Sequence, residues 1–261
     1  MPVPLESDRD KTYWTPRRVR LFSQAAQLSD FPAQVMKALE PALFGCRSAL
    51  DVGAGVGALT VPLAKRIPHV TALEPSATMM EELQANLARN HLDNVACLPA
   101  AWGEASVTTH DLILVANVAP IFKNLLGFLT AAESLAGDAL VLVQNVGPGT
   151  EKFYFGELYP LLLDRPYPPR EDYLNTLTLL HSLGIYANTQ IVSYQFDQPF
   201  ATLQDAVDFW TEQMHLTESN QQRKLRSFLQ ARLQPTGSHL IAPMRRRSAV
   251  IWWRVTSKDS L

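Results

Sequence analysis

Short apolar runs alternate along this chain with longer stretches in which apolar residues recur every three or four positions. Short continuous apolar runs are typical of strands buried on both faces, and the longer period is typical of amphipathic helices. The predicted strands span residues 48–53, 70–73, 95–98, 111–118, 139–146, 185–196 and 248–255. The predicted helices span residues 16–28, 32–40, 56–66, 77–90, 121–135, 203–214 and 218–233, and a turn is expected at 235–237.

Two helix starts carry specific capping signals. Thr15 precedes Pro16 as an N-cap precedes a proline at the first helical position, and Ser76 is placed as the N-cap of the helix that follows it. The regular alternation of strand and helix predicts a parallel sheet with helices on both faces, because parallel strands need long, right-handed crossovers.

The chain is expected to form one α/β domain with two additions. Residues 1–47 are predicted to be a helical N-terminal extension that acts as a lid, and residues 48–261 to be the main domain. Residues 147–184 are rich in tyrosine and phenylalanine and contain a proline cluster, so we expect a helical cap insertion there.

Composition excludes several classes of protein. Apolar residues make up 47% of the 261 residues, and 23 basic residues face 25 acidic ones, which argues against disorder and against a globally basic nucleic-acid binder. The N-terminal thirty residues lack the apolar block of a signal peptide, and no apolar run reaches the length of a membrane span. Cys46 and Cys97 have no disulfide or metal spacing, and the six histidines show no metal pattern. We therefore expect a soluble, cytoplasmic protein without a metal site.

The most informative segment is the glycine loop, Leu50-Asp-Val-Gly-Ala-Gly-Val-Gly57. Gly53 and Gly55 allow a sharp turn and a close approach of the backbone to a ligand, and Gly57 allows close packing of helix on strand. The loop also fits a dinucleotide pattern with Ala58 as its last position, and Glu74 follows at a distance that suits a ribose. Alone, it does not separate a nicotinamide cofactor from an adenosyl one.

Three features favour an adenosyl ligand. The Asp51 carboxylate, two residues before the first glycine, would repel a pyrophosphate and attract a cation. The helical residues before Ser48 offer a lid. After Glu74, the segment Pro-Ser-Ala-Thr-Met-Met80 supplies a helix cap and a thioether suited to an adenine face.

Asp51-x-Gly-x-Gly-x-Gly57 followed by Glu74-Pro-Ser-x-x-Met79 resembles the class I S-adenosylmethionine-dependent methyltransferases, over about residues 49–146. The resemblance implies a doubly wound, mostly parallel sheet of seven strands in the order 3-2-1-4-5-7-6, with the last strand antiparallel. It also implies S-adenosyl-L-methionine as methyl donor and S-adenosyl-L-homocysteine as product.

The resemblance further implies a set of donor-binding positions. Asp51 would act near the methionine moiety, Glu74 would accept both ribose hydroxyls, and Met79 would contact adenine. Alanines (Ala100 and Ala101) stand where the family has an acid for the adenine amino group. The full set is Asp51, Gly53, Ala54, Gly55, Gly57, Glu74, Pro75, Met79, Ala101, Trp102 and Asn117.

The acceptor is less defined by the sequence. Asn117-Val-Ala-Pro120 departs from the Asn/Asp-Pro-Pro-aromatic motif of enzymes that methylate bases or glutamine side chains, which favours a small-molecule acceptor. Candidate substrate residues are Tyr13, Trp14, Tyr154, Tyr159, Arg165, Tyr167 and Arg170. For the tyrosines, packing within a helical cap is the alternative. Arg245-Arg-Arg247 would either grip phosphate or form an exposed basic edge.

Methyl transfer needs in-line placement and exclusion of water, and it needs a base only if the acceptor must lose a proton. The sequence therefore assigns no catalytic base, although His181 and His215 are candidates. The alternatives are an RNA or protein methyltransferase with the same donor site, an NAD-dependent oxidoreductase, and a non-catalytic sensor.

Overall fold

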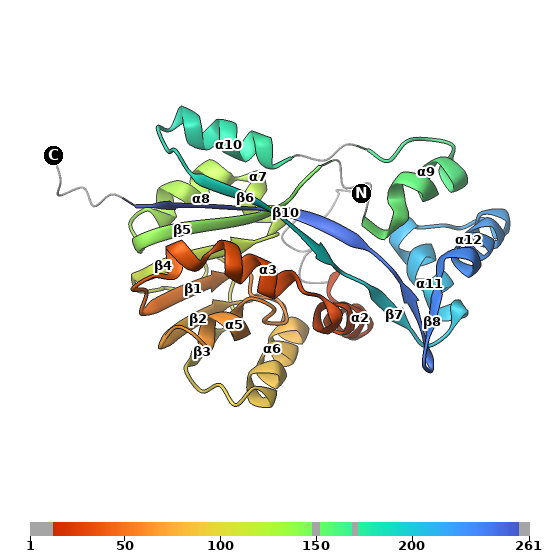
Figure 1. Ribbon diagram of the computed structural model, residues 1–261, viewed down its shortest axis with the longest axis horizontal. Coiled ribbons are helices and arrows are strands. Elements are labelled where there is room, and N and C mark those ends of the chain that lie inside the picture. Colours follow the sequence, from red (N-terminus) through yellow and green to blue (C-terminus); the bar gives the residue numbers. More distant parts are fainter. Residues whose placement is uncertain (1–12, 148–151, 169–171, 256–261) are drawn as a thin grey trace.

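A seven-stranded sheet forms the centre of the protein in a computed structural model that describes residues 13–147, 152–168 and 172–255 (Figure 1). Its order is β3-β2-β1-β4-β5-β10-β6. The first five of these strands are parallel, and β10 runs antiparallel to both β5 and β6. The strands are β1 (Ser48–Val52), β2 (His69–Leu73), β3 (Val95–Leu98), β4 (His110–Ala116), β5 (Ala136–Asn145), β6 (Asn188–Gln195) and β10 (Arg245–Arg254). The predicted order, with the last strand antiparallel, is confirmed.

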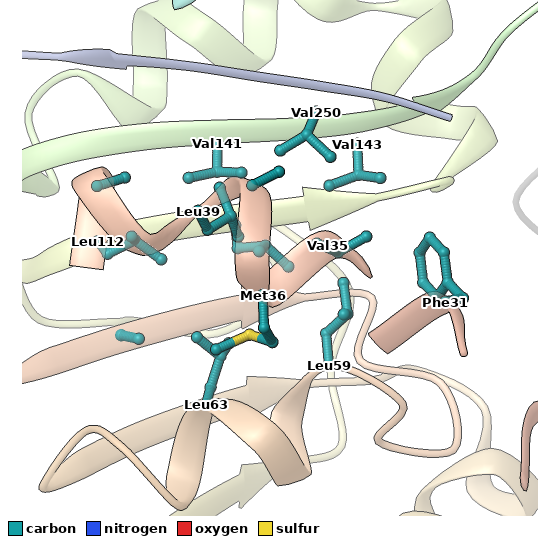
Figure 2. Close-up of a cluster of buried hydrophobic side chains, with 14 of the residues drawn as sticks. Phe31, Val35, Met36, Leu39, Leu59, Leu63, Leu112, Val141, Val143 and Val250 are labelled. Carbon is teal, nitrogen blue, oxygen red and sulfur yellow. The ribbon is translucent and has the colours of Figure 1, made fainter. Parts of the chain in front are cut away.

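Side chains alternate between the two faces of the sheet, as they do along any strand. On one face, the apolar side of α3 packs over β1, β4, β5 and β10. Leu39 lies near Val141, and Met36 points toward Leu63 (Figure 2). The helices on this face are α2 (Pro16–Leu28), α3 (Phe31–Ala38), α4 (Glu40–Leu43), α5 (Thr60–Ala64) and α6 (Ala77–Arg89).

The opposite face of the sheet carries the side chains of Ala249, Ile251 and Trp253 of β10, together with those of Leu140 and Leu142 of β5. They pack against α7 (Ala119–Lys123), α8 (Leu125–Ala132) and α10 (Tyr173–Ser182). Helices cover both faces, as the alternating pattern predicted.

A further apolar cluster forms a lobe beyond the N-terminal end of β10 (Figure 1). Its centre is the fully buried Trp210, whose indole Nε1 donates to the carbonyl of Phe153 at 2.7 Å. The lobe contains η1 (Lys152–Tyr154), α9 (Phe155–Leu163), α11 (Leu203–Met214), α12 (Ser219–Arg232) and the small sheet β7 (Gln198–Phe200), β9 (His239–Ala242), β8 (Gln234–Thr236).

Four local predictions differ from the structure. The helix predicted at 121–135 is divided into α7 and α8 at Asn124, whose ψ of 50° is not helical. The helix predicted at 56–66 is limited to Thr60–Ala64, because the glycine loop continues as turns up to that point. The turn expected at 235–237 begins within β8 of the small sheet. Finally, the segment 147–184 is divided, since α9 joins the lobe whereas α10 covers the sheet.

The division of the chain into a lid, a main domain and a cap stays a prediction. Among the described residues, no helix combines the length and the apolar character that crossing a membrane requires. The cytoplasmic location also stays a prediction.

Candidate active site

The glycine loop lies at the carboxyl end of β1, where the amides of Gly53 and Ala54 donate to the carbonyl of Leu73 at 2.8 and 2.9 Å. Two of its glycines are required by close packing. A Cβ on Gly53 would lie 2.4 Å from Cγ2 of Val118, and one on Gly57 would lie 2.5 Å from Cδ1 of Leu83. The loop is therefore held between the end of β4 and helix α6.

Gly55 differs from the other two glycines of the loop. Its φ is +57°, and a Cβ built on it would meet no atom within 4 Å. Among the described residues, no neighbouring atom would prevent a side chain at this position. The loop is thus open at Gly55, where a ligand can approach the backbone closely.

Asp51 is a buried carboxyl directly beneath this loop, with 2% of its surface exposed. Its Oδ2 accepts a hydrogen bond from Oγ1 of Thr60 at 2.7 Å. Burial raises the pKa of Asp51 to about 6; the Thr60 hydroxyl opposes this rise, and the charge of Glu74 adds to it. Sequence reasoning missed Thr60, although a hydroxyl at the start of the following helix was a usable signal.

Glu74 connects the loop to the turn after β2. Its Oε2 accepts from the Gly55 amide and its Oε1 from the Ser76 amide, both at 2.9 Å. These two bonds fix the carboxylate beside the open part of the loop. Each carboxylate oxygen has two lone pairs, so an oxygen that accepts from an amide can also accept from a hydroxyl. The Ser76 side chain accepts from the Met79 amide, which confirms the predicted N-cap.

Met79 packs beside the loop rather than into an open space. Its side chain is 2% exposed and clusters with Val19 of α2 and Val56 of the loop, with Trp14 and Phe22 packed against them. The structure thus brings Trp14 to the cluster that contains Val56 of the loop, and its role in an N-terminal lid stays a prediction. The contact of Met79 with adenine stays a prediction, and half-buried Pro75 lies between Glu74 and the cap Ser76.

Asn117 follows β4 and is exposed, with a φ of +56° that asparagine adopts more readily than most residues. Its amide donates to the Val143 carbonyl at 2.8 Å. Because the next residue, Val118, contacts Gly53, the structure brings Asn117 to the glycine loop.

Trp102 packs on the other face of the sheet, with its ring 4.9 Å from that of Phe128. The neighbouring Ala101 amide donates to Oε2 of Glu104 at 2.9 Å. Glu104 lies three residues after Ala101, so this hydrogen bond is local to the turn.

The tyrosines proposed for the acceptor lie mainly within the lobe. Tyr154 stacks on Trp210 and donates from its hydroxyl to the Pro243 carbonyl at 2.8 Å, and Tyr167 is buried against Phe155 and Tyr159. This is the cap-packing alternative, and the structure does not bring these side chains to the glycine loop.

The other acceptor candidates have separate positions. Exposed Arg165 lies over the Tyr159 ring, and Tyr13 lies beneath the guanidinium of Arg18 and donates to Gln213 of α11. Arg170 lies outside the described residues.

Comparisons with known proteins agree with this arrangement. Residues 49–130 match a family model described as a methyltransferase domain. That match begins in β1 and includes the glycine loop, Asp51 and Glu74. Residues 49–130 form a methyltransferase domain. The sheet order around this match is that of the class I, Rossmann-like methyltransferase fold. The resemblance seen in the sequence is therefore confirmed.

Part of this chain is similar to part of each of two curated proteins. It is 33% identical over 140 residues to a phosphoethanolamine N-methyltransferase of Triticum aestivum, covering 49% of this chain and 26% of that protein. It is also 33% identical over 98 residues to an uncharacterised methyltransferase of Mycobacterium bovis, covering 35% of this chain and 50% of that protein. The chain thus spans at most half the length of these two relatives.

The fold is similar to that of a solved Bacillus halodurans protein. The two structures superpose with a TM-score of 0.55 at 16% identity, over 87% of this chain and 99% of that chain. This similarity supports the fold alone.

Proposed function

We propose that this protein transfers a methyl group from S-adenosylmethionine to a small-molecule acceptor. The observation that carries the proposal is the open backbone at Gly55, placed between the buried Asp51 carboxyl and the Glu74 carboxylate. The donor carries a ribose and a positively charged sulfur, and these residues fit both groups.

The electrostatics of Asp51 favour this donor over a dinucleotide. A buried carboxyl with a raised pKa is destabilised as an anion, and a nearby cation would compensate that loss. A pyrophosphate at the same loop would add a further negative charge to Asp51 and Glu74. The residues therefore fit a cationic nucleoside better than a nicotinamide dinucleotide.

When bound, S-adenosylmethionine supplies a methyl group on a sulfonium, which becomes a neutral thioether as the methyl leaves. Asp51 would interact with the methionyl part, Glu74 would accept from the ribose hydroxyls, and the Gly55 backbone would pass beneath the ligand. Trp14 and α2 pack against Val56 of the loop and would exclude water from the bound donor. Proximity and orientation of this kind lower a barrier by up to about 7–11 kcal/mol.

A small-molecule acceptor is supported by two points. The segment after β4, Asn117-Val-Ala-Pro120, lacks the motif of enzymes that methylate bases or glutamine side chains. In addition, one relative is named for phosphoethanolamine, a small molecule.

The proposal is tested by incubating the protein with methyl-labelled S-adenosylmethionine and a cell extract separated into small-molecule, RNA and protein fractions. We expect label in the small-molecule fraction together with release of S-adenosylhomocysteine. Label confined to RNA or protein would contradict the acceptor class, and no transfer at all would contradict the activity. A fluorescence change of NADH on mixing would favour the oxidoreductase instead.

A matched pair of variants links the activity to this site. Glu74→Gln removes the charge that fixes the loop, and we expect donor affinity to fall by about 1.5–3 kcal/mol. Glu81→Gln makes the same change on the exposed surface of α6 and should leave affinity unchanged. Equal affinities of the two variants would remove Glu74 from the site.

A further inference from the structure

Arg246 lies in the first part of β10, where this strand extends beyond the end of β5 toward the lobe (Figure 1). The last register pair of these strands joins Ser248 to Asn145, so Arg246 is two residues past the carboxyl end of β5. The glycine loop follows the carboxyl end of β1. Strand β1 is parallel to β4, and β4 is parallel to β5, so their carboxyl ends lie on the same side. Arg246 and the loop therefore lie at the same end of the sheet. This is the carboxyl end of the parallel strands, where ligands bind in α/β folds.

The sequence offered two roles for Arg245–Arg247, a grip on phosphate or an exposed basic edge. These residues have register partners in β6 only, because they lie past the last register pair of β10 with β5. Arg245 and Arg247 are exposed, but Arg246 points to the opposite face from both. Its guanidinium carbon lies over two aromatic rings, 4.2 Å from the ring centre of Phe196 and 5.0 Å from that of Phe153.

The guanidinium of Arg246 is an incompletely satisfied cation. Its Nε and Nη2 atoms are buried and have no hydrogen-bond partner. No carboxylate of the described residues forms an ion pair with it, in contrast to Arg18, which is paired with Glu212. Burial lowers the pKa of Arg246 to about 10, and the nearby Tyr194 opposes this change. Buried charges are normally paired, so a cation of this kind points to a missing anionic partner.

The unsatisfied atoms are arranged for one type of ligand. The N–H groups on Nε and Nη2 point in parallel from one edge of the planar guanidinium, and such a fork matches two oxygens of a carboxylate or phosphate. The guanidinium lies over the rings of Phe153 and Phe196. Because Nε and Nη2 are both buried, the side chains around this edge must move for an anion to enter.

A continuous set of aromatic contacts connects Arg246 to the glycine loop. The ring centres of Phe196 and Phe22 of α2 are 5.8 Å apart, and those of Phe22 and Trp14 are 5.5 Å apart. Trp14 and Phe22 both pack against the cluster that contains Val56 of the loop. A molecule held at Arg246 would thus lie on the side of the sheet that carries α2 and the donor loop.

We propose that the Nε–Nη2 edge of Arg246 binds an oxyanion of the methyl acceptor, so that the acceptor is an anionic small molecule carrying a carboxylate or phosphate. This assignment rests on the proposed methyltransferase function. The acceptor's anionic group would be anchored by Arg246 while its reactive atom faces the donor.

The test uses the full chain and three small aromatic probes at constant ionic strength: benzoate, phenyl phosphate and neutral benzamide. Thermal unfolding is followed with and without S-adenosylhomocysteine. We expect at least one anionic probe, at ten times its Kd, to raise the melting temperature by about 2–4 °C, and benzamide to have no effect. Benzoate and phenyl phosphate distinguish a carboxylate site from a phosphate site.

Arg246→Met and Arg245→Met are the matched variants. The anion-dependent shift should vanish in Arg246→Met and persist in Arg245→Met, which changes an exposed arginine of the same strand. Without anions, Arg246→Met should melt at or above the wild-type temperature, because it removes an unpaired buried charge.

Three results would overturn the proposal: no shift with either anion, an equal shift in both variants, or a strongly lowered melting temperature of Arg246→Met without anions. The last would show that Arg246 has a structural role. Failure of S-adenosylhomocysteine to bind the wild type would instead contradict the methyltransferase function, and the anion measurements without it would still decide the role of Arg246.

Discussion

Asp51→Asn is expected to stabilise the ligand-free protein while it weakens donor binding. The pKa of Asp51 is raised from 3.8 to about 6, and each pH unit corresponds to about 1.36 kcal/mol, so the ionised form costs about 3 kcal/mol of folding free energy at neutral pH. Asparagine has nearly the same shape and keeps an oxygen that accepts from the Thr60 hydroxyl. The substitution thus removes the charge and retains the hydrogen bond.

The sign of the pH dependence follows from the raised pKa. The folded protein binds the proton more tightly than the unfolded chain, so this group's contribution is fully present below pH 3.8 and is lost as the pH rises through about 6. Urea unfolding of wild type and Asp51→Asn between pH 4 and 7 measures the difference, in which the titrating groups that do not interact with Asp51 cancel. Asp51→Asn should gain stability relative to the wild type as the pH rises.

Two results would refute this reasoning. The first is a pH-independent difference between the two proteins, which would show that the Asp51 pKa is close to its ordinary value. The second is a large loss of stability in Asp51→Asn at pH 7, which would show that the ionised carboxylate stabilises the fold.

Two further predictions concern the same loop. Because protonation removes the charge of Asp51, donor affinity should fall about tenfold between pH 7 and pH 5. Thr60→Val, which removes the hydroxyl that lowers this pKa, should move the midpoint above 6. Calorimetric titrations across this range test both statements, and a flat pH profile of the wild type would contradict them. Gly57→Ala should cost more stability than Gly55→Ala, because its Cβ meets Leu83 at 2.5 Å whereas that of Gly55 meets nothing. Overpacking adds about 1–3 kcal/mol to the cost of a left-handed alanine. Gly55→Ala should instead reduce donor affinity, and equal effects of the two variants on affinity would contradict this division of roles.

The sheet could be predicted because each strand is short, apolar and bounded by turn residues, and because crossovers between parallel strands have a fixed hand. The glycine loop, Asp51 and Glu74 are close in sequence to the ends of β1 and β2, so local pattern placed them correctly. The Ser76 and Thr15 caps were predictable for the same reason.

The remaining features depend on contacts between distant segments. The lobe combines α9 with α11, α12 and a small sheet, and no local pattern indicates that residues some fifty positions apart share one core (Phe155 and Trp210, for example). Arg246 follows one arginine and precedes another. It differs from them because successive side chains of a strand point to opposite faces, and on its face Phe153 and Phe196 lie against it. Thr60 was missed because its importance lies in its hydrogen bond to the Asp51 carboxylate, which forms only in the folded protein.

Isothermal titration calorimetry with S-adenosylmethionine at neutral pH tests the central claim most directly, since it asks whether the loop between Asp51 and Glu74 holds this nucleoside. We predict saturable binding at one site with a Kd well below 1 mM, weakened in Glu74→Gln and unchanged in Glu81→Gln. Absence of binding, or a Kd of about 1 mM or weaker in the wild type, corresponds to about 4 kcal/mol or less and would contradict the account.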